Sequence, residues 1–201
     1  MTSTPRDAAA QVPDSRLAGA FRELHGKRLH GFALLVSLGE TGLSERVASE
    51  ALEAGAAQAS ELRHPERAAA WLRARALRGL HQGVGRGPSP TTAERREALA
   101  TLGVDAPMYD GLAMLGLEAR AALVASAVER FESIDIETIL GASPSAARKV
   151  ITRSRAHYLE AVHGQPAEKA GFAQVLPDDA IVTRVRQVTD RAMTPGWKPP
   201  R

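Results

Sequence analysis

Residues 139–155 read ILGASPSAARKVITRSR. An apolar helix ends there at Gly141, and a second helix starts after Ser143. Glycine readily adopts the left-handed conformation that ends a helix, serine caps helix starts, and proline suits the first turn. We therefore expect a short helix over 134–140, a tight turn, and a second helix that begins at Pro144.

At 100° per residue, the second predicted helix has an apolar side and a polar side. The apolar side contains Ala147, Val150, Ile151, Ser154, Tyr158 and Val162. The polar side supplies the candidate DNA-contacting residues, which are Ser145, Arg148, Lys149, Thr152 and Arg153, with Arg155 at its flank. A short helix, a glycine turn and a capped cationic helix are typical of a helix-turn-helix, whose second helix enters the major groove. The alternative is an ordinary surface helix with its charges in water.

The composition favours helical domains. The chain has 201 residues, enough for one domain or two small ones, and its 44% hydrophobic and 24% charged residues are typical of a globular protein. Aromatic residues make up only 4%, and no alternating strand pattern of useful length appears, so we predict an all-α fold. The net charge of +3 and the pI of about 9.7 permit nucleic-acid binding without requiring it.

Several classes of site and location are disfavoured. The absence of cysteine excludes disulfides, thiol nucleophiles and zinc knuckles, and fits a reducing cytoplasm. The first residues lack the apolar core of a signal peptide, and no apolar run is long enough to span a bilayer. The acids are dispersed and the six histidines include no pair spaced four residues apart, so we expect no catalytic residue, metal or cofactor. The prediction is a cytoplasmic protein that is not an enzyme and has no membrane partner.

Glycine and proline divide the chain. We predict a disordered lead-in (1–15), a helical domain (16–82), a linker (83–92), a second helical domain (93–164) and an extension with one helix (165–201). The linker GVGRGPSPTT lacks the Lys-Ser/Thr pair and the preceding strand of a phosphate-binding loop, which favours the interpretation as a linker. Thr91 and Glu94 form a predicted capping box at the start of the second domain, and Pro65 suits a helix start in the first.

The order of these segments resembles a known family. Segment 111–162 has a leucine-rich helix, a break, an apolar helix centred on an arginine, and then the helix-turn-helix. The residues that carry this pattern are Leu112, Leu115, Arg120, Leu123, Val124, Ile136, Leu140, Gly141, Ser143 and Pro144. The pattern resembles region 4 of the bacterial extracytoplasmic-function sigma factors. Upstream, segments 21–52 and 64–77 are similar to region 2 of the same family.

The resemblance implies a role in transcription initiation. Such proteins bind core RNA polymerase, melt the downstream promoter element with region 2 and read the upstream element with region 4. Trp71, Arg75 and Arg78 become candidate contacts to the melted strand, and Glu45, Arg46, Ser49 and Glu50 become candidate polymerase-docking residues. The implied partners are promoter DNA, core RNA polymerase and an anti-sigma factor.

Three departures from the family pattern leave alternatives open. Arg46 and Ser49 replace an acid and a glutamine on the docking helix, which favours as an alternative a regulator that binds DNA or a partner without engaging polymerase. As an alternative to contacting the melted strand, Trp71 is half-buried under the stems of two arginines, Arg75 and Arg78. Glu137 occupies a position that is normally small, so we expect it either to reach a cation such as Arg148 or to splay the two helices.

Overall fold

The computed structural model describes residues 15–59, 61–62, 64–83 and 89–163. These residues form helices and turns without any strand, which confirms the all-α prediction. The helices are α1 (Ser15–Val36), α2 (Thr41–Ala57), α3 (Pro65–Gly83), α4 (Thr92–Ala100), α5 (Ala106–Ala113), α6 (Leu117–Leu123), the π-helical turn η1 (Val124–Val128), α7 (Ser133–Leu140) and α8 (Pro144–His163).

Side-chain caps fix several helix starts. Thr91 accepts from the backbone N–H of Glu94, and the Glu94 carboxylate accepts from the N–H of Thr91, so the predicted capping box is confirmed at α4. Asp105 caps α5 by accepting from the N–H of Met108 at 2.9 Å. Pro65 is the first residue of α3, as expected from its missing N–H.

One stretch of backbone departs from regular helix. α6 continues directly into η1, where the N–H of Glu129 donates to the carbonyl of Val124 at 3.0 Å. Arg130 then adopts a left-handed conformation with φ 56°, which is unusual for a residue that is not glycine. π-helical turns often occur at functional positions of helices. Here η1 and the left-handed Arg130 change the direction of the chain before α7.

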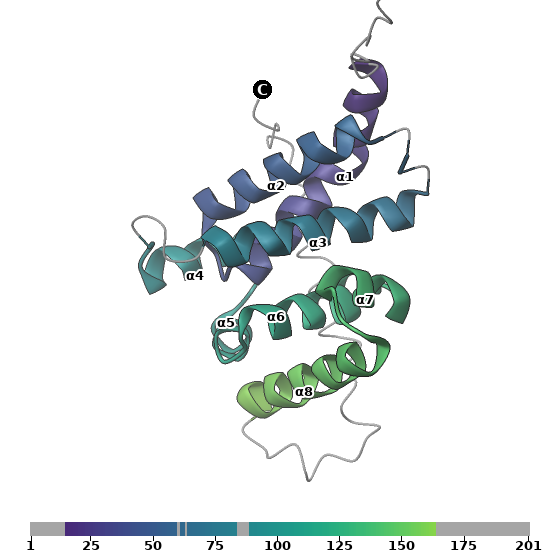
Figure 1. Cartoon of the computed structure of the whole chain (residues 1–201). Coiled ribbons are helices and arrows are strands. Elements are labelled where there is room, and N and C mark those ends of the chain that lie inside the picture. Colours follow the sequence, from purple (N-terminus) through teal and green to yellow (C-terminus); the bar gives the residue numbers. More distant parts are fainter. Residues whose placement is uncertain (1–14, 60, 63, 84–88, 164–201) are drawn as a thin grey trace, which may run out of the picture.

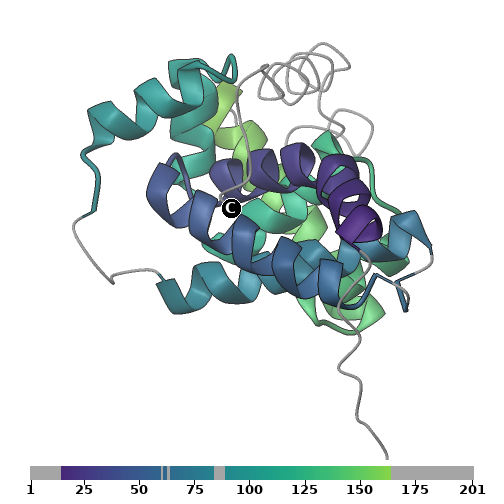
Figure 2. The ribbon, with the colours of Figure 1, turned by 90° about the horizontal axis from the view of Figure 1, so that it is seen from above.

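The helices pack in three layers (Figure 1). α1, α2 and α3 pack against one another and form the N-terminal block, while α4–α8 form the C-terminal block. Within the C-terminal block, α5, α6 and α7 make the middle layer and α8 packs on its outer side. α3 packs on α7, and α1 packs on α6 and η1, so the N-terminal block covers the middle layer. Figure 2 shows α4 at the edge of this arrangement.

The two blocks share one hydrophobic core. Buried side chains of α1 and α3, such as Phe32 and Leu72, belong to the same cluster as Leu123 and Ile136 of the C-terminal block. The division into two domains therefore stays a prediction. The lead-in up to residue 14, linker residues 84–88 and the C-terminal extension with its predicted helix lie outside the described residues, whereas Ser15 belongs to α1.

Helices of the described part are too short or too polar to cross a lipid bilayer. The longest of them, α1 with 22 residues, contains several charged side chains along its length.

The contact of α2 with α1 and α3 depends on a glycine. A Cβ at Gly55 would lie 2.7 Å from the ring of Phe21 and 2.8 Å from a methyl group of Leu72. We predict that Gly55→Val lowers the free energy of unfolding by about 1–3 kcal/mol through overpacking. Gly42→Ala, at an open position of the same helix, should raise it by about 0.5–1 kcal/mol. Urea unfolding followed by circular dichroism tests both, and equal effects would contradict the proposed packing.

Candidate nucleic-acid interface

α7 and α8 are joined by a turn of three residues. Gly141 adopts the left-handed conformation with φ 60°, as predicted, and its N–H donates to the carbonyl of Thr138 at 3.3 Å. The N–H of Ala142 donates to the carbonyl of Glu137 at 3.1 Å, which satisfies a second free carbonyl of α7. Ser143 accepts from a backbone N–H of the first turn of α8 at 3.4 Å, so the predicted cap is present.

The inner side of α8 packs on the middle layer. Ala147, Ser154 and Tyr158 are buried, and Ile151 is half-buried beside them. Burial, followed by the nearby charge of Asp105, raises the pKa of Tyr158 to about 12, so this side chain stays neutral at physiological pH. The predicted apolar side of this helix therefore faces the interior, and the polar side is left outside.

Four of the predicted DNA-contacting residues are exposed on the outer side of α8. They are Ser145, Arg148, Lys149 and Thr152. The Arg148 guanidinium donates to the carbonyl of Pro144 at 3.3 Å, and no acid of the described residues forms an ion pair with Arg148 or Lys149. These cations are therefore solvated and available to an anionic partner.

The two remaining arginines lie differently. Arg153 is exposed, but it lines a hollow of about 470 Å³ between α3, α6 and α8, together with His81, Glu118 and His157. Arg155 is half-buried, its Nε has no hydrogen-bond partner among the described residues, and burial lowers its pKa. At the flank of the helix, Arg155 is thus partly covered by protein, unlike the exposed residues of the outer side.

The candidate strand contacts do not form one free surface. Trp71 is half-buried against the core, and the Arg75 guanidinium lies 5.9 Å from the centre of its ring. Arg78 is exposed one turn later. The half-burial of Trp71 fits the alternative expected from the sequence, but the contact with its ring is made by the guanidinium of Arg75 and not by two arginine stems.

The candidate docking residues lie on the outer side of α2. Glu45, Arg46 and Glu50 are exposed, whereas Ser49 is half-buried with a hydroxyl that has no hydrogen-bond partner among the described residues. The neighbouring Ser44 is completely buried, and its hydroxyl lies 2.8 Å from that of Ser37. The exposed candidate docking residues are therefore two acids, Glu45 and Glu50, and one arginine, Arg46.

Glu137 is half-exposed, and no described cation forms an ion pair with it. The expected pairing with Arg148 is therefore absent. Ala147 is only 2% exposed, so α7 and α8 remain in close contact even with a glutamate at this position. Because Glu137 is partly exposed, the cost of burying an unpaired carboxylate is reduced.

No known protein family, curated protein or solved structure matches this chain. A functional assignment therefore rests on the residues and their geometry. Among the described residues, no group of three or more histidine or acidic side chains is placed to hold a metal ion.

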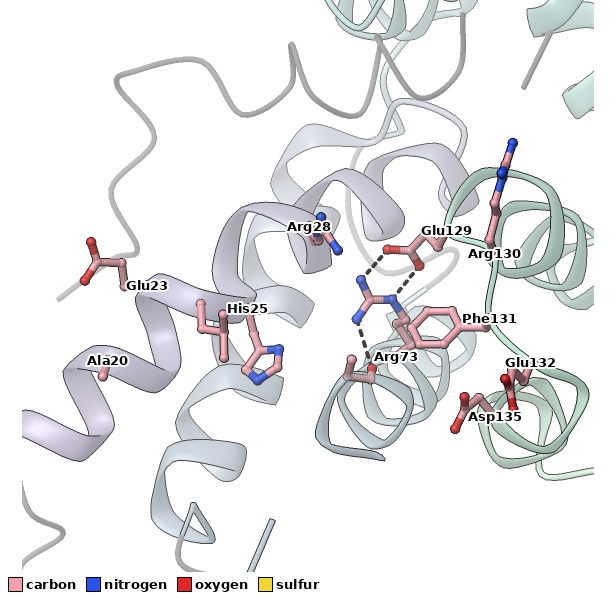
Figure 3. Close-up of a pocket in the computed structure, with 12 residues that line it drawn as sticks. Ala20, Glu23, His25, Arg28, Arg73, Glu129, Arg130, Phe131, Glu132 and Asp135 are labelled. Carbon is pink, nitrogen blue, oxygen red and sulfur yellow. Dashed lines mark hydrogen bonds and ion pairs between the residues drawn. The ribbon is translucent and has the colours of Figure 1, made fainter. Parts of the chain in front are cut away.

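The structure also brings together residues that the sequence pattern did not single out. Arg73 of α3 reaches Glu129, which follows η1, and the two form an ion pair (Figure 3). Phe131 lies with its ring 4.9 Å from the Arg73 guanidinium. A clue in the sequence was the position of Arg73 within a stripe of alanine and leucine on α3, where an arginine needs a buried partner.

A pocket of about 880 Å³ opens beside this pair, and His25 of α1 lies in its wall (Figure 3). Burial, and then the charges of Arg73 and Arg28, lower the pKa of His25. The other charged residues around the pocket are Glu23, Glu129, Arg130, Glu132 and Asp135. His25 is thus neutral in the folded protein near neutral pH.

This environment predicts a pH dependence of stability. Because folding lowers the pKa of His25 from its usual 6.5, the unfolded chain binds more protons just below that pH. Burial lowers the pKa of His30 as well, so both act in the same direction. We expect the free energy of unfolding to fall between about pH 7.5 and about pH 5.5, and to fall less in His25→Gln.

Urea titrations at both pH values measure the effect. His64→Gln, at an exposed position before α3, is the matched control and should keep the wild-type dependence. An unchanged pH dependence in His25→Gln would contradict the assignment.

Proposed function

We propose that the chain is a sigma-factor-like transcription initiation protein that binds duplex DNA through α8. The observation that carries the proposal is the exposed set of Ser145, Arg148, Lys149 and Thr152, which follows the capped turn after α7 and whose two cations form no ion pair with a described acid. In a helix-turn-helix, the first turns of the second helix contact base edges, and nearby cations contact phosphates.

The position of α8 suits this role. It packs on α5, α6 and α7 and lies on the side of the molecule away from α1–α3, so its outer side faces no other described layer (Figure 1). In this proposal Ser145, the second residue of the helix, contacts a base edge, whereas Arg148 and Lys149 neutralise phosphates. Promoter DNA is therefore the proposed partner.

Polymerase engagement is the second part of the proposal. It rests on the resemblance to region 2 and on the exposed Glu45 and Glu50 of α2, which suit a basic partner. The exposed Arg46 between them opposes such a partner, and it favours the second candidate, a DNA-binding regulator that does not engage polymerase. In either case the proposed location is the cytoplasm, and an anti-sigma factor remains a proposed regulator of the first candidate.

The first test concerns DNA. A duplex is selected from a random library with the full-length protein and then titrated at several salt concentrations. Lys149→Ala, if it removes a phosphate contact, should flatten the log–log salt slope by about one unit. Ser145→Ala, if it removes a base contact, should cost about 1–3 kcal/mol and relax the sequence preference.

Arg67→Ala, on the exposed side of α3, is the matched control for removing one positive charge and should bind as the wild type. Undetectable duplex binding at low salt, or wild-type binding by both α8 variants, would refute the role of α8.

The second test concerns polymerase. Arg46→Asp removes a repulsive charge and adds an attractive one on the outer side of α2, so we expect it to strengthen association with core RNA polymerase. The measurement is a titration of core enzyme with both forms, followed by run-off transcription. Absence of binding by both forms, alongside intact duplex binding, would leave the second candidate.

A further inference from the structure

A pocket of about 880 Å³ lies where α1, α3 and the stretch from the end of η1 to the start of α7 meet (Figure 3). Its lining residues include none from α8, so the pocket is separate from the proposed DNA contacts. Its volume falls within the range of about 300–1,000 Å³ that is usual for pockets that bind small molecules. The pocket is therefore large enough for an organic ligand of moderate size.

His25 of α1 has an unsatisfied side chain in the wall of this pocket. The residue is 7% exposed, and neither ring nitrogen has a hydrogen-bond partner among the described residues. Its ring centre lies 4.7 Å from that of Phe21, and Figure 3 shows the imidazole on the side of α1 that faces the pocket. A buried polar group without a partner costs free energy, so such groups in proteins are satisfied by water or by a ligand.

The chemistry beside His25 suits an anionic group. Burial, and then the charges of Arg73 and Arg28, lower the pKa of His25, so the imidazole is neutral and has one N–H to donate. Arg73 already donates to Glu129 and to the carbonyl of Ala69. Arg28 is exposed and forms no ion pair with a described acid. A carboxylate bound here would accept from His25 and pair with Arg28.

The opposite wall of the pocket is acidic. Glu132 is exposed, and its side chain makes no capping hydrogen bond to α7 and no ion pair with a described cation. Asp135, in the first turn of α7, adds a second acid, and Figure 3 shows both acids beside Phe131. Glu23 and Arg130 lie at the outer edges of the view. The pocket thus has a positive part near His25 and a negative part near α7.

We propose that this pocket binds a small zwitterion with an apolar body, whose carboxylate contacts His25 and Arg28 and whose ammonium group pairs with Glu132. An anion without an amine would face the acids of α7, and a cation without a carboxylate would face Arg28, so a ligand with both charges is favoured. Leu24, which is 62% exposed, and Phe131 supply apolar contacts for the body of the ligand. Binding there does not depend on DNA binding by α8.

Nuclear magnetic resonance of the full-length protein with labelled histidine tests the proposal. The chain has six histidines, and the imidazole signal of His25 is the one absent from His25→Leu, or from His25→Gln if the leucine variant fails to fold. The probes are phenylalanine, whose two charged groups share a carbon, and para-aminomethylbenzoate, in which a ring separates them. Each is compared with the two analogues that lack its amine or its carboxylate.

We expect one of the two zwitterions to shift the His25 signal saturably. Its single-charge analogues should bind at least about tenfold more weakly, because each loses a charged hydrogen bond. Arg28→Gln should weaken the zwitterion and its carboxylate analogue by about tenfold. Glu132→Gln should weaken the zwitterion alone. Both substitutions are at exposed positions, so circular dichroism should stay native.

Arg67→Gln on α3 and Glu97→Gln on α4 are the matched controls. Each removes one exposed charge outside the pocket and should bind the zwitterion as the wild type does. Absence of a saturable His25 shift with both zwitterions would overturn the proposal, and water alone would then satisfy His25. Equal binding of the zwitterion and its carboxylate analogue, or wild-type binding by both Arg28→Gln and Glu132→Gln, would also overturn it.

Discussion

The guanidinium of Arg120 connects the two blocks at the point where three helices meet. It donates to the carbonyls of Val36 at 2.8 Å, Leu115 at 2.7 Å and Leu112 at 3.4 Å. Val36 is the last residue of α1, Leu112 lies in the last turn of α5, and Leu115 lies in the turn between α5 and α6. The end of a helix leaves carbonyls without a partner inside the helix, and Arg120 supplies donors there. Burial lowers the pKa of Arg120, but an arginine remains charged, so one side chain satisfies acceptors from both blocks. This contact joins α6 to the end of α1 and to the end of α5.

Buried and exposed cations of this fold differ in the partners that they contact. Arg73 and Arg120 lie inside, with partners in other helices, while Arg148 and Lys149 lie outside and form no ion pair with a described acid. Only the second kind is available to neutralise phosphate, since a satisfied buried guanidinium has no free donor to offer. The net charge of +3 therefore says little about DNA binding, and the placement of a few side chains on α8 says more.

Local structure was predictable because its causes are local. The capping box at Thr91, the left-handed Gly141 and the proline that begins α8 each depend on neighbours within a few residues. The pairing of Arg73 with Glu129 joins positions 56 residues apart, and no periodic pattern encodes it. The burial of Arg155 was missed for a related reason. Whether the flank of a helix is covered depends on the elements packed beside it, which helical periodicity does not reveal.

The candidate contacts on α8 and those on α3 differ in their surroundings. On α8, apolar packing and polar exposure follow from one helical period, so Ser145, Arg148, Lys149 and Thr152 are exposed as the pattern predicts, and their contact with DNA stays a prediction. On α3, Arg75 lies over the ring of Trp71, so an aromatic group that would stack on a base is already in contact with a cation of its own chain. A melted strand would have to displace that contact. The proposed duplex binding by α8 requires no such rearrangement, because Arg148 and Lys149 are already exposed.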